Sequence, residues 1–157
     1  MKRIFIDTEF TDFLDLHLIS IGLVSAAGEE FYAEVPFPDE SCSAFVREAV
    51  IPLLGRIPDA VMSRDSLCKQ LLAWLSAVRP ENTDIGICYD YQTDLDLFID
   101  AIDYQVPAWC PPRLIASNID EILKYEFYKK HELPQHHALY DARANLAAFQ
   151  ESDDDRH

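Results

Sequence analysis

The sequence has few basic residues, few glycines and no long apolar run, and each shortage excludes a class of protein. Thirteen lysines and arginines stand against 28 acidic residues, which gives a formal net charge of −15. This balance argues against a protein that holds long duplexes through an extended phosphate-neutralising surface. Four glycines and nine scattered prolines form no linker-like run. We therefore expect one domain over residues 1–150.

Neither the opening residues nor the cysteines fit an exported or membrane protein. The opening MKRIFIDTEF meets an acid after a short apolar stretch, so it matches neither a secretory signal nor a membrane span. We expect a cytoplasmic protein with no membrane partner. No CxxC zinc pattern or short disulfide framework is present, so reduced, buried thiols are expected for the cysteines. These are Cys42, Cys68, Cys88 and Cys110.

The excess of acids has two further readings. Carboxylates gathered around divalent cations let the cations supply positive charge that the side chains lack, so a nucleic-acid enzyme is not excluded. Residues 151–157 contain four acids and are expected to form a disordered, solvated tail.

Apolar spacing predicts strands in the first third of the chain and alternating helices and strands after it. We expect strands at 3–7, 16–26 and 30–35, with a tight turn at Gly28, that form an antiparallel meander. The later elements are expected to be helices at about 42–53, 67–78, 93–103, 119–130 and 139–149, and strands at 85–89 and 113–116. Thr93 and Asp96 resemble a capping box at the start of the third helix. This order predicts an α/β domain with a mixed sheet flanked by helices.

The first candidate for chemistry is Asp7-Thr8-Glu9, at the end of the opening strand. Alternation along a strand puts Asp7 and Glu9 on the same face, where two carboxylates repel each other unless a cation lies between them. Mg²⁺ and Mn²⁺ prefer such hard oxygen ligands. A solvated strand edge is the simpler and more common explanation of an isolated motif of this kind.

Two later segments also place acids where a regular element begins. Asp94 follows the expected strand at 85–89 and opens a helix, a position where the helix dipole favours an acid whatever the function. His136 and His137 precede Asp141 at the start of the last helix, and adjacent histidines also occur as plain surface residues. Because all three segments carry acids at element ends, we expect them to converge on one point of the domain.

Taken together, the three segments resemble the exonuclease motifs of the DEDDh family of 3′→5′ exonucleases. They read D-T-E at 7–9, D-Y-Q-T-D-L-D-L-F at 90–98 and H-H-A-L-Y-D-A at 136–142. That family, which includes polymerase proofreading domains, RNase T and oligoribonuclease, has a ribonuclease-H-like fold. The compact size and the DTEF opening are most similar to small stand-alone bacterial exoribonucleases, including the mycobacterial type.

The resemblance implies a site. Four carboxylates would hold two divalent cations, Mg²⁺ or Mn²⁺, and His136 would be the general base. The carboxylates are those of Asp7, Glu9, Asp94 and Asp141. Two departures concern substrate contacts: Asp90 stands where proofreading members usually carry Asn, and Phe10-Thr11-Asp12 replaces their Thr-Thr-Gly.

The choice of base has two answers at this stage. Helical periodicity favours His137, which lies four residues before Asp141 and would share its face. The family pattern favours His136, and we prefer it because a loop residue ahead of the helix can turn toward the attacking water. Tyr140 adjoins Asp141 and does not have the spacing used by the tyrosine variant of the family.

The implied reaction is hydrolysis from a 3′ end to nucleoside 5′-monophosphates. Two cations roughly 3.5–4 Å apart generate a nucleophile and stabilise the leaving oxygen, and a neutral imidazole accepts a proton near neutral pH. Phe10 would stack on the last base, although core packing explains it nearly as well, and Thr8 is a second substrate-binding candidate. Family similarity favours single-stranded or short RNA and a homodimer.

Three alternatives remain open. A DNA 3′→5′ exonuclease would use the same site, and an inactive domain would serve as a nucleic-acid-binding or assembly module. An endonuclease of the ribonuclease-H type does not need the segment at 136–141.

Overall fold

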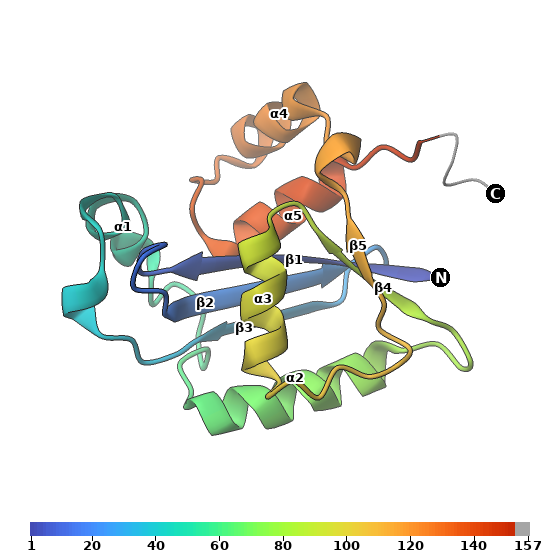
Figure 1. Cartoon of the computed structure of the whole chain (residues 1–157). Coiled ribbons are helices and arrows are strands. Elements are labelled where there is room, and N and C mark those ends of the chain that lie inside the picture. The colour runs from blue at the N-terminus through green and yellow to red at the C-terminus, as the bar shows by residue number, and fades with distance from the viewer. Residues whose placement is uncertain (153–157) are drawn as a thin grey trace.

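Five strands form one mixed sheet in the order β3-β2-β1-β4-β5 (Figure 1). The strands are β1 (Lys2–Phe10), β2 (Leu18–Ser25), β3 (Glu30–Glu34), β4 (Ile85–Tyr89) and β5 (Pro112–Leu114). β2 pairs antiparallel with β1 and with β3, whereas β4 pairs parallel with β1 and with β5. The computed structural model describes residues 1–152. The predicted meander followed by parallel strands is therefore confirmed.

Helices cover both faces of the sheet. They are α1 (Ala44–Ala49), α2 (Arg64–Val78), α3 (Gln92–Ala101), α4 (Glu121–His131) and α5 (Ala138–Ala148). Alternation along β1 separates the two faces, because Ile4 and Ile6 join the core under α2 and α3 while Phe5 joins the core under α5. Figure 1 shows α4 and α5 above the sheet and α2 below it. The sheet is therefore buried on two sides, as its central strands require.

Two expected helix boundaries were wrong. The helix expected at about 42–53 is interrupted: α1 ends at Ala49, and a 3-10 turn with Pro52 at its start follows at Ile51–Leu53. Proline cannot donate the backbone hydrogen bond that would continue the helix. Thr93 is no capping residue, since α3 begins at Gln92 after the extended residue Tyr91, with no side-chain cap.

A close approach between α5 and β2 fixes how the last helix lies on the sheet. A Cβ at Gly22 would come within 2.6 Å of the Leu139 backbone nitrogen and Cα. Gly22 pairs with Asp7 on β1, so the first turn of α5 lies directly beside the end of β1. Only glycine permits this contact, which brings the residues after Leu139 close to the β1 carboxylates.

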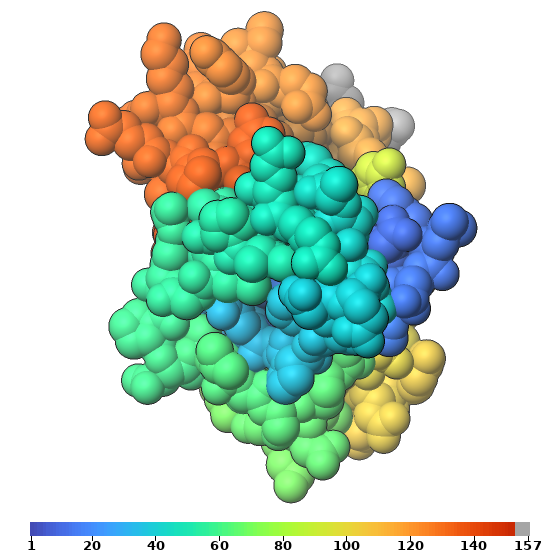
Figure 2. Space-filling view, turned by 90° about the vertical axis from the view of Figure 1, so that its left-hand side faces the viewer, coloured from blue at the N-terminus to red at the C-terminus, as the bar shows by residue number. Residues whose placement is uncertain are grey.

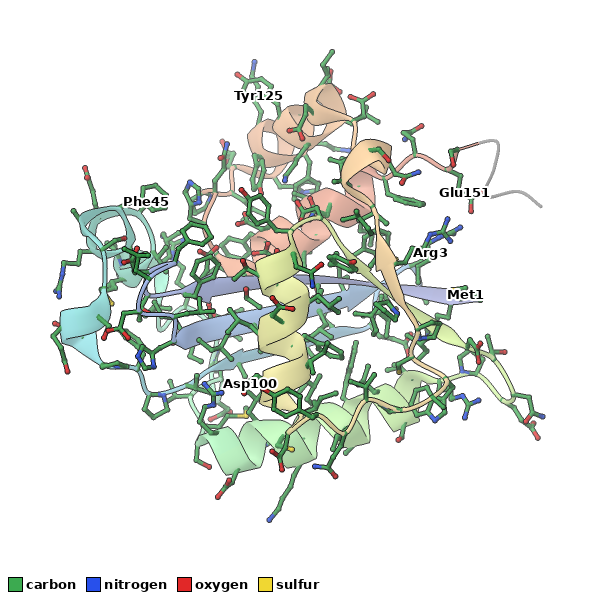
Figure 3. The ribbon with its side chains drawn as sticks, viewed as in Figure 1. Met1, Arg3, Phe45, Asp100, Tyr125 and Glu151 are labelled. Carbon is green, nitrogen blue, oxygen red and sulfur yellow. The ribbon has the colours of Figure 1, made fainter. Side chains whose placement is uncertain are left out.

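The remaining expectations concern the cysteines, the membrane and the tail. All four cysteines are free, with Cys68 partly exposed and the others buried. No helix within the described residues is long and apolar enough to cross a membrane. Glu151, the first residue of the expected tail, forms an ion pair with Arg3 (Figure 3), and residues 153–157 lie outside the described part.

Candidate active site

A pocket of about 370 Å³ lies at the C-terminal end of β1. Its wall brings together segments that are far apart in the sequence: the end of β1, the loop after it, α1, the β4–α3 junction and the residues around α5. In Figure 2 the teal segment that includes α1 lies between the orange C-terminal elements and the blue N-terminal segment. Its lining includes the His136 side chain and six carboxylates, those of Asp7, Glu9, Asp12, Asp90, Asp94 and Asp141.

β1 supplies two of these carboxylates through its alternation. Asp7 and Glu9 follow Phe5 on the face that α5 covers, whereas Thr8 points to the α3 side. The pairing register with β2 shifts between Glu9 and Phe10, which ends the regular strand at the pocket. Asp7 Oδ2 is buried with no hydrogen-bond partner among the described residues.

α3 supplies Asp94 from its first turn. The Thr8 hydroxyl donates a 2.6 Å hydrogen bond to Asp94 Oδ1, and the Thr8 backbone N–H donates another of 3.2 Å. Burial raises the pKa of Asp94 to about 7, against the lowering effect of these hydrogen bonds. Thr8, expected to contact substrate, is itself 4% exposed and engaged with Asp94.

Asp141 in the first turn of α5 receives two donors. The Tyr128 hydroxyl on α4 donates a 2.5 Å hydrogen bond to Asp141 Oδ1. The His136 backbone N–H lies 3.2 Å from both carboxylate oxygens. Three elements therefore meet at this carboxylate, since α4 packs against α5 and the loop before α5 folds back over it.

Little positive charge balances the crowded carboxylates among the described residues: Lys124 lies 4.0 Å from Asp90, and Lys124 and His136 act to lower the pKa of Asp141, which burial raises. Burial, and then the charges of Asp94 and Asp141, hold the pKa of Asp7 well above its ordinary value. Burial and the neighbouring Asp141 raise the pKa of Glu9 to about 9. Such shifts indicate a site that requires cations or protons before all its carboxylates are accommodated.

The ligand atoms fall into two groups. One group consists of Glu9, His136 and Asp141, and the other of Asp7, Asp90 and Asp94; within each, one ligand atom per residue lies within 4.8 Å of the others. Carboxylate oxygens of this kind suit Mg²⁺ and Mn²⁺. The buried, unpartnered oxygen of Asp7 also fits a cation, so the residues present fit a pair of divalent metal ions.

The two adjacent histidines have opposite surroundings. His136 lines the pocket with a left-handed backbone, φ 71°, and its ring lies edge-on to Phe45 at 4.9 Å between centroids. His137 is 2% exposed and stacks between Tyr32 and Tyr140, at 4.8 and 3.9 Å. Burial lowers the pKa of His137 to about 4, helped by Arg56 and Arg143.

This separation follows from where α5 begins. His137 is the N-cap of α5 and has an extended backbone, so it lies outside the regular helix. The periodicity argument that linked His137 to Asp141 requires both residues to be helical, and it therefore does not apply. The structure places His136 beside Glu9 and Asp141, and it places His137 in a separate, closed aromatic stack.

Aromatic rings form another part of the pocket wall. Phe10 and Phe13 contact each other edge-on at 5.0 Å, and Phe10 also packs against the main core. Phe45 and Tyr91 are more than half exposed on the other sides of the pocket. Both explanations offered for Phe10, core packing and a surface for a base, are therefore compatible with its position.

Sequence reasoning missed three residues of this site. Tyr128 gives no local signal, because its hydroxyl reaches Asp141 only after α4 packs on α5. Phe45 lies in a short helix far from every motif. Asp90 was noted only as a departure from a pattern, although its position directly after a buried strand and four residues before Asp94 is a signal that it faces the same point.

The fold is ribonuclease-H-like, and two solved structures share it. Cell-death related nuclease 4 (CRN-4) matches with a TM-score of 0.58 and 16% identity over 92% of this chain and 61% of that chain. The nuclease domain of 3'hExo, a DEDDh family member solved with rAMP bound, matches with a TM-score of 0.57 and 12% identity over 94% of this chain and 90% of that chain.

This likeness concerns the fold alone. The chain spans 61% of the length of the CRN-4 chain, and both identities are low. Comparison with protein-family models and with curated protein sequences finds no match.

Proposed function

We propose that this chain is a metal-dependent 3′→5′ exonuclease with His136 as its general base. The observation that carries the proposal is the convergence of Asp7, Glu9, Asp94, Asp141 and His136 on one pocket, from three segments of a ribonuclease-H-like fold. The names of the two structural neighbours, a nuclease and a nuclease domain, support the same class.

The side chains divide the work of phosphodiester hydrolysis. Asp7, Glu9, Asp94 and Asp141 would hold two divalent cations, which supply a nucleophilic water and neutralise the reacting phosphate. His136 would accept the proton of the attacking water, and the position of its imidazole beside Glu9 and Asp141 supports this role. Mg²⁺ and Mn²⁺ both suit this ligand set.

The pocket favours the end of a single strand as substrate. A volume of about 370 Å³ with aromatic walls is in the range of small-ligand sites and accommodates a terminal nucleotide better than a continuous duplex. Phe10 and Phe45 would offer rings to the last base without reading its identity. The net charge of −15 also disfavours long phosphate tracks. We propose single-stranded or short RNA as substrate and nucleoside 5′-monophosphates as products.

The test is digestion of 5′-labelled single-stranded RNA and DNA of the same sequence with Mg²⁺ or Mn²⁺. Wild type is compared with Asp7→Ala and His136→Ala. The expected result is a ladder that shortens from the 3′ end of RNA and that both variants lose. Faster digestion of DNA would reassign the substrate. If wild type and both variants give the same products, the nuclease proposal fails.

We also propose a cytoplasmic homodimer in which residues 1–150 form one domain. The dimer has its own measurement, since light scattering on the purified chain reports a mass of one or two copies. If the purified chain is a monomer and still degrades RNA, the dimer proposal fails and the proposed activity stands.

A further inference from the structure

Asp90 is a further carboxylate of the pocket, at the junction between β4 and α3. It directly follows the last residue of β4, and Asp94 stands one helical turn further on in α3. One oxygen each from Asp90, Asp7 and Asp94 lie within 4.8 Å of one another. The strand end and the helix start therefore hold two carboxylates beside Asp7.

The oxygens of Asp90 are poorly supplied with donors. Its Oδ1 is buried and has no hydrogen-bond partner among the described residues, as is also true of Asp7 Oδ2. Asp90 and Asp7 therefore each present an unpaired oxygen within the same group of three acids. Buried carboxylate oxygens without donors are costly unless a cation is near.

An ordinary ion pair explains Asp90 less well. The Lys124 Nζ on α4 lies 4.0 Å from Asp90 Oδ2, beyond hydrogen-bond distance, and both side chains are about a fifth exposed. A pair at this distance lacks the hydrogen bond that makes a close ion pair strong. An Asp that served only Lys124 would not need to adjoin two other acids.

We propose that Asp90 is a direct ligand of the cation held by Asp7 and Asp94, so that this position has three carboxylates. The proposal rests on the proposed metal-dependent function and deepens it. It gives this site one more negative charge than an amide at the same place would give. The expected consequence is tighter binding of that cation and a lower requirement for free metal.

The test is Mn²⁺ titration of the metal-free chain by isothermal calorimetry, with wild type beside three variants. Asp90→Asn removes the proposed ligand and keeps the shape. Asp12→Asn is the matched control, because Asp12 lines the same pocket but belongs to neither ligand group. Lys124→Met removes the ion pair and leaves the Asp90 carboxylate in place.

The variants separate a ligand from an ion-pair partner by the sign of the effect. Asp90→Asn is expected to weaken one of two Mn²⁺ equivalents by about tenfold or more, while Asp12→Asn changes it by less than about threefold. Lys124→Met is expected to tighten binding or leave it unchanged, because a nearby positive charge has gone. Metal-free Asp90→Asn is expected to melt no lower than wild type, which excludes misfolding as the cause.

Different failures have different meanings. If Asp90→Asn and Asp12→Asn give the same isotherm while wild type binds two Mn²⁺, Asp90 is no ligand and the proposed nuclease site stands. If Lys124→Met reproduces the loss seen in Asp90→Asn, the aspartate acts through the lysine and the inference is overturned. If wild type binds no Mn²⁺, the proposed function and the inference both fail.

Discussion

The carboxylates of the pocket differ in what holds them. Asp94 and Asp141 accept hydrogen bonds from Thr8, from Tyr128 and from the His136 backbone. Asp7 and Asp90 each have a buried oxygen with no donor among residues 1–152. The first two are oriented by the protein itself, whereas the other two depend on what binds between them.

This difference separates two tasks that one acidic cluster performs. Carboxylates with protein donors keep their direction before any cation arrives, which prepares the site. Carboxylates without donors repel one another and destabilise the fold until a cation compensates them. Substitutions in the two sets are therefore expected to affect stability in opposite directions.

The largest effect is expected at Asp7. Asp7→Asn removes the central acid of the pocket and should lower nuclease activity at least about a hundredfold, since even residues that only orient a ligand cost 10- to 100-fold. The melting temperature in EDTA should stay the same or rise, because a buried repulsive charge has gone. Calorimetric melting and RNA digestion measure the two effects. If Asp7→Asn melts at a lower temperature than wild type in EDTA, the comparison between the two sets of carboxylates is contradicted.

A loss of comparable size is expected at one histidine only. His136→Ala should lower kcat by about 10²- to 10⁴-fold, the usual contribution of a general base. His137→Phe should keep activity within about threefold, since its ring only fills the stack between Tyr32 and Tyr140. Its stability should hold or rise, because two buried nitrogens without partners disappear. If His137→Phe loses activity but keeps wild-type stability, the choice of His136 as the general base is wrong.

The donor residues should give intermediate effects. Tyr128→Phe and Thr8→Val each remove a hydrogen bond to a buried carboxylate and should weaken cation binding about tenfold. Each should also cost about 1–3 kcal/mol of unfolding free energy, unlike Asp7→Asn. Mn²⁺ calorimetry and chemical denaturation measure both quantities. If either variant is more stable than wild type, the division between oriented and unsupported carboxylates is wrong.

The smallest effect is expected from a change in pH. The pKa of Glu9 is raised to about 9 and that of Asp94 to about 7 from ordinary values of 4.5 and 3.8. The folded state therefore binds protons more tightly than the unfolded state, so metal-free stability should fall as pH rises from about 4.5 to about 9. Mg²⁺ should restore the most stability at the alkaline end of this range. Melting curves in EDTA and in Mg²⁺ give the comparison, and a metal-free stability that rises through this range would refute it.

Local patterns predicted the fold because most of its elements depend on neighbouring residues. Alternation in β1 and the apolar runs of β2 and β4 are visible along the chain, and the expected turn at Gly28 has a positive φ of 94°. The boundaries that failed depend on backbone detail, such as the 3-10 turn at Ile51–Leu53. The mixed sheet follows from the order of elements, but its strand order does not.

The site was predictable as far as its motifs are local. Asp7, Glu9, Asp94 and Asp141 each stand at an element end, so convergence was a reasonable expectation, and they line one pocket. Contacts across elements gave no signal. The Tyr128 hydroxyl and the Phe45 ring reach the site only through the packing of α4 and of α1, which a single sequence does not encode as a pattern.

The backbone at His136 has a consequence for how this chain tolerates change. Its φ of 71° lies in the left-handed region, which glycine adopts without steric cost. A residue with a Cβ is destabilised there by about 1 kcal/mol. A laboratory selection for heat resistance alone should therefore enrich glycine at position 136. The same selection with turnover also required should keep the imidazole, so comparing the two pools would show directly what this residue contributes besides folding.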